Sequence, residues 1–305
     1  MPSRRDLLRG ALLCAGALPL AACGSTPQPP AGAPRYRISL AQWSLHRALQ
    51  GGRLDNLDFP RVAREDYGIA GVEYVNSFFR DRAEDLTYLG ELRTRAEGSG
   101  VRSLLIMVDG EGALGAQDDA ERAAAIANHH RWIRASAFLG GHSIRVNAAG
   151  KGDRDEHSRR AADSLHQLCV TGEEYGISVI VENHGGPSSD GAWLAETIRR
   201  ADHPGCGTLP DFGNFGLEDG TQYDRYRGVA ELMPYAKAVS AKSHDFDAAG
   251  NEVHTDYRRM LDLVVASGYD GWIGVEYEGK SLSEPDGIRA TKALLEREFA
   301  RIEGA

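Results

Sequence analysis

The feature that most restricts the fold of this chain is a regular alternation of short apolar segments with longer amphipathic ones from residue 36 onward. Segments enriched in β-branched residues predict eight strands, at 36–44, 71–76, 101–108, 142–147, 177–184, 207–212, 238–246 and 272–277. Segments with helical periodicity lie between them, for example at 118–139, 156–175, 192–201 and 257–267. Eight strand-then-helix units predict an α/β protein with the (β/α)8 TIM barrel fold, a single domain over residues 35–305.

Glycines placed directly before predicted strands support this interpretation. Gly68, Gly100, Gly176 and Gly268 each follow a helical segment, at the position where a left-handed cap is common. A doubly wound open sheet is the alternative fold, but no Gly-x-Gly-x-x-Gly motif follows the first predicted strand. The barrel is therefore favoured.

The first 34 residues differ in character from the rest. Arg4 and Arg5 precede an apolar run that is too short to span a bilayer, a pattern typical of a twin-arginine signal peptide. The run ends in Leu-Ala-Ala before Cys23, as in a lipobox, so we expect residues 1–22 to be removed and Cys23 to be lipidated. Residues 23–34 are rich in proline and glycine and predict a flexible tether. The alternative is a buried amphipathic helix with a chance arginine pair.

The charge of the chain and its signal-like leader restrict which partners it can bind and where in the cell it is expected. The chain carries 35 Lys and Arg against 44 Asp and Glu, a formal charge of −9, whereas nucleic-acid binding requires a concentrated basic face. Cys169 and Cys206 follow the expected leader, and we interpret both as buried apolar residues, with a disulfide as the alternative. We therefore expect no nucleic-acid partner. The leader predicts export to the periplasmic side of a bacterial membrane, with membrane contact through the lipid anchor only.

Polar residues gather at the ends of the predicted strands, where the active site of a barrel lies. The strand ends contribute Glu73 and Asn76; Arg145 and Asn147; Glu182, Asn183 and His184; Asp211 and Asn214; Lys242, His244 and Asp245; and Glu276 and Glu278. Alternation along a strand places Glu182 with His184, and Lys242 with His244, on one face. Buried charges are costly unless they are paired or bind a metal, so a set of structural ion pairs made by Lys242 and Arg145 is the alternative to a functional site.

Four of these strand ends resemble the xylose isomerase-like barrel superfamily, whose members are usually described as sugar phosphate isomerases or epimerases. The segments are Val181-Glu182-Asn183-His184, Leu209-Pro210-Asp211-Phe212-Gly213-Asn214, Ala241-Lys242-Ser243-His244-Asp245-Phe246 and Gly274-Val275-Glu276-Tyr277-Glu278-Gly279. The resemblance covers residues 36–303. It implies a divalent metal (Mn, Mg, Co or Zn) held by Glu182, Asp211, Glu276 and a residue of the seventh strand.

The seventh strand departs from the family pattern, which often reads His-x-Lys-Asp there. In this chain Lys242 takes the position of the ligand histidine and His244 that of the lysine. A protonated lysine cannot bind a cation and repels it. Three arrangements follow: His244 completes the metal site, His184 substitutes, or the site works without metal and Lys242 supplies the positive charge. We expect the first arrangement, in which His244 completes the metal site.

These residue types suit isomerase or epimerase chemistry. Moving a carbonyl, or inverting a carbon beside one, requires a carboxylate to remove a proton and an acid to return it. A metal ion or an ammonium group stabilises the enediolate that forms. We expect Glu182, Glu276 and Lys242 to be catalytic. Side chains expected to bind sugar hydroxyls are His46, Arg145, Asn147, His184 and Asn214, and an aromatic wall is expected from Trp43, Phe78 and Trp193.

The predicted location narrows the substrate. Phosphorylated sugars are mainly cytosolic, and no phosphate-binding glycine-rich loop is evident, so a non-phosphorylated sugar or keto-sugar is expected. A lyase or dehydratase acting on a 3-keto-sugar is an alternative, because it shares the enolisation step. A carbohydrate-binding lipoprotein without catalytic activity is another, although it would not need both Glu182 and Glu276. A homo-oligomer is left open.

Overall fold

The computed structural model describes residues 36–304. The expected signal peptide, the lipidated Cys23 and the tether lie outside the described residues and stay predictions. In the described part of the chain, no helix combines the length and the apolar character needed to cross a bilayer.

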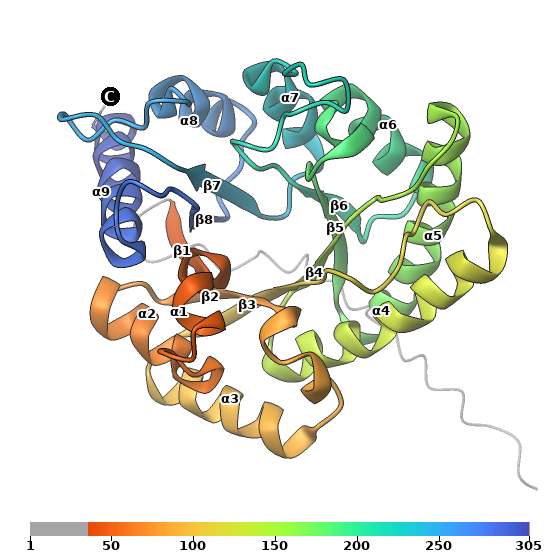
Figure 1. The fold of residues 1–305 in the computed structure, drawn as a ribbon, viewed down its shortest axis with the longest axis horizontal. Coiled ribbons are helices and arrows are strands. Elements are labelled where there is room, and N and C mark those ends of the chain that lie inside the picture. The colour runs from red at the N-terminus through yellow and green to blue at the C-terminus, as the bar shows by residue number, and fades with distance from the viewer. Residues whose placement is uncertain (1–35, 305) are drawn as a thin grey trace, which may run out of the picture. The chain divides into compact units, whose positions relative to one another are not determined.

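Eight parallel strands follow one another around a ring (Figure 1). They are β1 Arg37–Ala41, β2 Gly71–Val75, β3 Arg102–Met107, β4 Ser143–Val146, β5 Ser178–Glu182, β6 Cys206–Leu209, β7 Val239–Ser243 and β8 Trp272–Tyr277. Strand β1 pairs with both β2 and β8. Between β6 and β7 the ring is completed by two parallel bridges, Thr208 to Ala236 and Asp211 to Ser240. This consecutive order confirms the predicted TIM barrel and excludes a doubly wound sheet.

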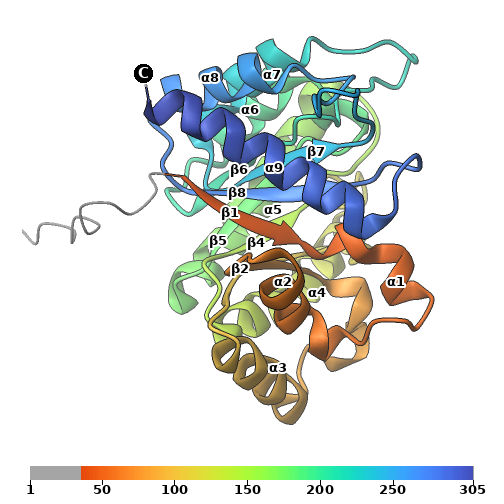
Figure 2. The same cartoon turned by 90° about the vertical axis from the view of Figure 1, so that its left-hand side faces the viewer.

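The α-helices surround the strands (Figure 1). They are α1 His46–Gln50, α2 Phe59–Tyr67, α3 Leu86–Gly98, α4 Asp119–Leu139, α5 Arg154–Tyr175, α6 Gly191–Ala201, α7 Arg225–Leu232, α8 Tyr257–Ala266 and α9 Glu284–Glu303. Short 3₁₀ turns occupy Gln42–Leu45, Asn56–Asp58, Asn76–Phe78, Arg80–Arg82, Gly186–Ser189 and Met233–Tyr235. Figure 2 shows α9 running alongside β8 and β1.

Local sequence explains where many of these helices begin and end. Helices α3 to α8 all begin after an aspartate whose side chain accepts a backbone N–H of the first turn. Gly68 and Gly176, the caps predicted for α2 and α5, have φ angles of 66° and 69°, in the left-handed region that glycine favours. The predicted helical segments are confirmed to within two residues.

Two apolar layers hold the barrel together. The larger lies between the strands and the helices and includes Trp132, Phe59 and Leu261, all fully buried. The smaller fills the barrel interior with alternate strand residues, namely Ala41, Val75, Leu105, Met107, Ile180, Leu209 and Ala238. Polar or charged residues lie at or just beyond the carboxyl ends of β4 to β8, and these residues make the candidate site.

Candidate active site

Carboxylates and cations meet inside the barrel at the carboxyl ends of β4 to β8. The buried members are Arg145 on β4, Glu182 on β5, Asp211 after β6, Lys242 on β7 and Glu276 on β8, each at most 4% exposed. Glu278 follows β8 and is partly exposed. The structure thus brings together all three residues expected to be catalytic, and three of the four expected metal ligands.

Asp211 is fixed by the loop that follows β6. Its Oδ1 accepts the backbone N–H groups of Gly213 at 2.7 Å and Asn214 at 2.9 Å. Asn183 ties this loop to β5, since its side-chain amide donates to the Asp211 carbonyl and its Oδ1 accepts the Asp211 N–H. Asn183 therefore has a structural role. The Asn214 side chain instead reaches the site, where Nδ2 donates to Glu182 Oε1 at 3.0 Å.

Ser240, which sequence reasoning missed, links Asp211 to Glu276. Its Oγ lies 2.7 Å from Asp211 Oδ2 and 2.7 Å from Glu276 Oε2. A hydroxyl carries one hydrogen, so it cannot fully serve two ionised carboxylates. Burial raises the pKa of Asp211 to about 6, although the nearby charge of Lys242 opposes this shift. A single serine two residues before Lys242 gave no distinct signal in the sequence.

Lys242 Nζ lies among the carboxylates. It donates to Glu276 Oε1 at 2.8 Å and to Glu278 Oε1 at 2.9 Å, and it lies 3.7 Å from Asp211 Oδ2. Burial alone would lower the pKa of Lys242, but the surrounding carboxylates raise it well above its ordinary value. Lys242 is therefore a protonated cation.

Arg145 supplies the second cation and lies between two carboxylates. Its Nε is 2.9 Å from Glu182 Oε2, without the alignment of a hydrogen bond, and its Nη1 donates to Asp109 Oδ1 at 2.8 Å. Asn147, an expected hydroxyl-binding residue, donates to the same Asp109 oxygen at 2.7 Å. Asp109 was missed, although it is the first polar residue after the third predicted strand. The ion pairs of the structural alternative are thus present.

These ion pairs leave some polar atoms unsatisfied. Glu182 Oε2, Arg145 Nε and Asn147 Oδ1 are buried and have no hydrogen-bond partner in the described structure. Burial raises the pKa of Glu182 to about 8, against the opposing charge of Arg145. Burial also acts on Glu276, but contact with Lys242 outweighs it and lowers the pKa of Glu276. The pKa values of the two glutamates are therefore shifted in opposite directions, which is the relationship expected of an acid and a base.

Glu73 on β2 lies deeper in the barrel interior. Its Oε1 accepts the Ser39 hydroxyl at 2.6 Å, and its Oε2 is buried without a hydrogen-bond partner. Burial raises the pKa of Glu73 to about 7. A Cβ atom at position 274 would lie 2.7 Å from Glu73 Oε1, so Gly274 makes room for this side chain.

An aromatic surface borders the same end of the barrel. Trp43 stacks on His46 with ring centroids 4.9 Å apart, and the Phe78 ring lies 6.0 Å from Trp43. His46 Nδ1 donates to the Trp43 carbonyl at 2.7 Å, which leaves Nε2 free to meet a ligand. His184, two residues beyond the buried Glu182, is exposed at this end. The structure thus places His46 and His184 where a substrate could reach them.

Trp193 does not belong to this surface, which corrects the expectation for the aromatic wall. It lies on α6 outside the barrel and is 9% exposed. Its Nε1 donates to the Arg154 carbonyl, and its ring lies 5.0 Å from that of His157 on α5. The Trp193 side chain therefore packs between helices α5 and α6 and does not face the site.

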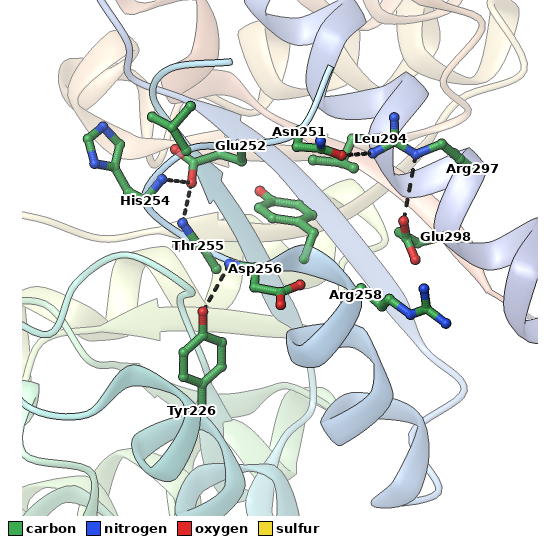
Figure 3. A pocket seen from close by; sticks show the side chains of 12 residues that line it. Tyr226, Asn251, Glu252, His254, Thr255, Asp256, Arg258, Leu294, Arg297 and Glu298 are labelled. Atoms are coloured by element: carbon green, nitrogen blue, oxygen red, sulfur yellow. Dashed lines mark hydrogen bonds and ion pairs between the residues drawn. The ribbon is translucent and has the colours of Figure 1, made fainter. Parts of the chain in front are cut away.

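A surface hollow of about 580 Å³ lies beside the loop that follows β7 (Figure 3). The hollow lies between the loop after β7 and helices α7 to α9. On its wall, the Glu252 carboxylate accepts the backbone N–H of His244 at 3.3 Å and that of His254 at 2.7 Å. Arg297 likewise bonds to Asn251 Oδ1. Because these polar groups form hydrogen bonds with one another, we infer that they hold the loop after β7 in place and do not bind a ligand.

The metal implied by the family resemblance can be tested against the donor set. Glu182, Asp211 and Glu276 each offer an oxygen atom within 4.8 Å of the others, a spacing that one oxygen-bound divalent ion could bridge. His244 is not part of this group. Lys242 Nζ, however, lies 2.8 Å from Glu276 and 3.7 Å from Asp211 and repels a metal ion. As arranged here, the residues do not fit a divalent metal, because a cation of the chain already lies among them.

The fold and this ring of strand-end residues define a TIM barrel with a buried carboxylate site. The chain belongs to the xylose isomerase-like TIM barrel family, whose model matches residues 62–298.

Solved structures share the fold at low sequence identity. An apo 3-keto-D-glucoside 4-epimerase from E. coli is 16% identical, with a TM-score of 0.64, over 86% of this chain and 99% of that one. An L-ribulose 3-epimerase is 15% identical, with a TM-score of 0.65, over 87% and 95%. The zinc-bound IOLI protein is 14% identical, with a TM-score of 0.68, over 87% and 98%. No curated protein sequence matches this chain significantly.

Proposed function

We propose that this protein is an isomerase that acts on a non-phosphorylated keto-sugar by removing a proton from the carbon beside the carbonyl. The observation that carries the proposal is the pair of buried glutamates, Glu182 and Glu276, whose carboxylate oxygens lie within 4.8 Å of each other at one end of the barrel. The opposite directions of their pKa shifts support it. The epimerases among the similar structures act on sugars of this kind, which supports the substrate class.

The reaction follows from the two protonation states. Ionised Glu276 removes the proton, the C–H electron pair forms a carbon–carbon double bond, and the carbonyl oxygen becomes the enediolate oxygen. Protonated Glu182 then returns a proton from another direction. Delivered to the same carbon, the proton inverts its configuration and the original carbonyl re-forms. Delivered to the former carbonyl carbon, with the neighbouring hydroxyl proton passing to the enediolate oxygen, it moves the carbonyl to the adjacent carbon. Exchange of both carboxyl protons with solvent restores the starting state.

The charge at the mouth of the site favours a substrate without phosphate. Asp109 and Glu278 are its partly exposed carboxylates, with side chains 37% and 29% exposed. Both would repel a phosphate dianion. The predicted export signal and lipidated Cys23 agree with such a substrate, and we propose a periplasmic, lipid-anchored location on the sequence evidence alone.

Deuterium incorporation tests this function. The protein is incubated in D₂O with a panel of ketoses and 3-keto-glycosides, and deuterium at the carbon beside the carbonyl is followed by NMR. We expect exchange, and a loss of about 10²–10⁴-fold in Glu182→Gln. The matched control is Glu196→Gln, because Glu196 is a surface residue paired with Arg199. Absence of deuterium across the whole panel would overturn the proposal.

A further inference from the structure

Lys242 is an unusual residue for a barrel interior. Lysine is almost never fully buried unless it is paired, and the Lys242 side chain is 1% exposed. Its partners are three carboxylates from two sides: Glu276 on β8 and Glu278 just after it, and Asp211 after β6. One ammonium group therefore bridges carboxylates from the two strands on either side of β7, namely β6 and β8.

The backbone around Lys242 is shaped to hold it. Lys242 and Glu276 are register partners on β7 and β8, so their contact is set by strand pairing. A Cβ atom on Gly213 would lie 2.7 Å from Lys242 Cγ, so glycine leaves space for the lysine stem. Tyr257 donates its hydroxyl to the Lys242 carbonyl at 2.9 Å. The position of the ammonium group is thus built into the fold.

The carboxylates around Lys242 are grouped as the ligands of a metal site would be, but the cation among them is an ammonium group. The oxygen atoms of Glu182, Asp211 and Glu276 form the cluster that a divalent ion would bridge. Nζ makes hydrogen bonds with one of these three residues and lies at ion-pair distance from a second. A divalent ion bound to the same oxygens would be only a few Å from this ammonium, and their repulsion would oppose binding.

We propose that Lys242 is the resident cation of this site in place of a divalent metal, and that the protein works without metal. This inference rests on the proposed function for its catalytic consequence only. The ammonium donates a hydrogen bond to Glu276 Oε1 at 2.8 Å and holds this carboxylate in place with its charge. Because it acts through its charge on neighbouring groups, Lys242 is a positioning and electrostatic residue.

Metal content is the decisive measurement. The full chain is treated with EDTA, exposed to excess Zn²⁺ or Mn²⁺, passed through a desalting column and analysed for metal. We expect wild type to retain less than about 0.1 equivalent, and Lys242→His to retain about one, because histidine removes the ammonium and adds a neutral nitrogen ligand. Lys242→Met removes the charge without adding a ligand and is expected to retain less than Lys242→His.

Lys237→His is the matched control, because Lys237 precedes β7 and donates to the Pro204 carbonyl away from the site. It should retain no more metal than wild type. About one equivalent in wild type would overturn the proposal, and so would a folded Lys242→His variant that gains none.

Isotope exchange by the wild-type protein keeps the inference testable if Lys242→His does not fold. Deuterium exchange that persists unchanged after EDTA treatment supports a metal-free site, and exchange that is lost and then restored by a metal ion overturns it. If no variant or wild type exchanges deuterium, the proposed function fails, and the metal content of the wild type still decides whether Lys242 takes the place of a metal.

Discussion

Arg145 Nε lies 2.9 Å from Glu182 Oε2, and both side chains are almost completely buried. The contact joins neighbouring strands β4 and β5 inside the barrel. Arg145 also contacts Asp109, which follows the preceding strand β3, so one guanidinium lies between two carboxyl groups. This incomplete compensation leaves Glu182 with a raised pKa and gives the site an acid near neutral pH.

Removing this cation should be costly. At about pH 9, above the pKa of about 8 for Glu182, Arg145→Met leaves the ionised Glu182 and Asp109 uncompensated, so we expect the free energy of unfolding to fall by about 3–5 kcal/mol in urea titrations. Arg134→Met is the control, because Arg134 forms an exposed pair with Glu84 and should change the free energy by about 1 kcal/mol or less. Equal effects of the two substitutions would contradict this account of the buried pair.

Glu276→Gln should abolish turnover and keep the fold. Glutamine cannot remove a proton, so we expect deuterium exchange to drop by about 10²–10⁴-fold while circular dichroism and the melting curve show a folded protein. Glu65→Gln, which changes an exposed helical pair with Arg61, should keep full exchange. Unfolding of Glu276→Gln would instead assign Glu276 to a structural ion pair.

Glu73 should make the protein less stable as the pH rises. Its pKa is about 7 in the folded chain and 4.5 ordinarily, so the folded state binds more protons between these values. The stabilising contribution is complete below pH 4.5 and is lost as the pH rises through 7. Between about pH 5 and about pH 8 we expect a loss of the order of 2–3 kcal/mol that Glu73→Gln removes. The free energy of unfolding is measured by urea titration at several pH values. If it depends on pH in the same way in wild type and in Glu73→Gln, this role is excluded.

The two tryptophans first grouped as one aromatic wall should behave differently. Trp43→Ala is expected to raise KM about tenfold, or ~1.4 kcal/mol, because Trp43 lies at the mouth of the site. Trp193→Ala should leave KM unchanged and lower the free energy of unfolding by about 3–5 kcal/mol, because Trp193 packs between α5 and α6. A raised KM in Trp193→Ala would contradict this placement.

Two helical glycines give a matched test of packing. A Cβ atom on Gly172 in α5 would lie 2.3 Å from the Ile177 carbonyl oxygen, whereas one on Gly90 in α3 has nothing within 4 Å. We expect Gly172→Ala to destabilise the protein by about 1–3 kcal/mol. Gly90→Ala should stabilise it by about 0.5–1 kcal/mol, because alanine is the better helix former. Melting temperatures that shift in the same direction would refute the packing argument.

The sequence alone determined the barrel and the residues at its carboxyl end. Strand and helix periods, together with glycines such as Gly68 and Gly176, act within a few residues of the chain, so they can be recognised without a structure. The same reasoning placed Glu182, Asp211 and Glu276 at the ends of the fifth, sixth and eighth strands, and the structure brings one oxygen atom of each within 4.8 Å of the others.

Only the tertiary structure decided how these residues meet. Lys242 among the carboxylates, Ser240 between Asp211 and Glu276, and Asp109 beside Arg145 all depend on strand register and on closure of the ring. Trp193 has an aromatic side chain of the kind that stacks on sugars, yet it packs outside the barrel. The physical reason is that a contact between residues about 30 or more positions apart is set by the packing of whole strands and helices, which local sequence patterns do not encode.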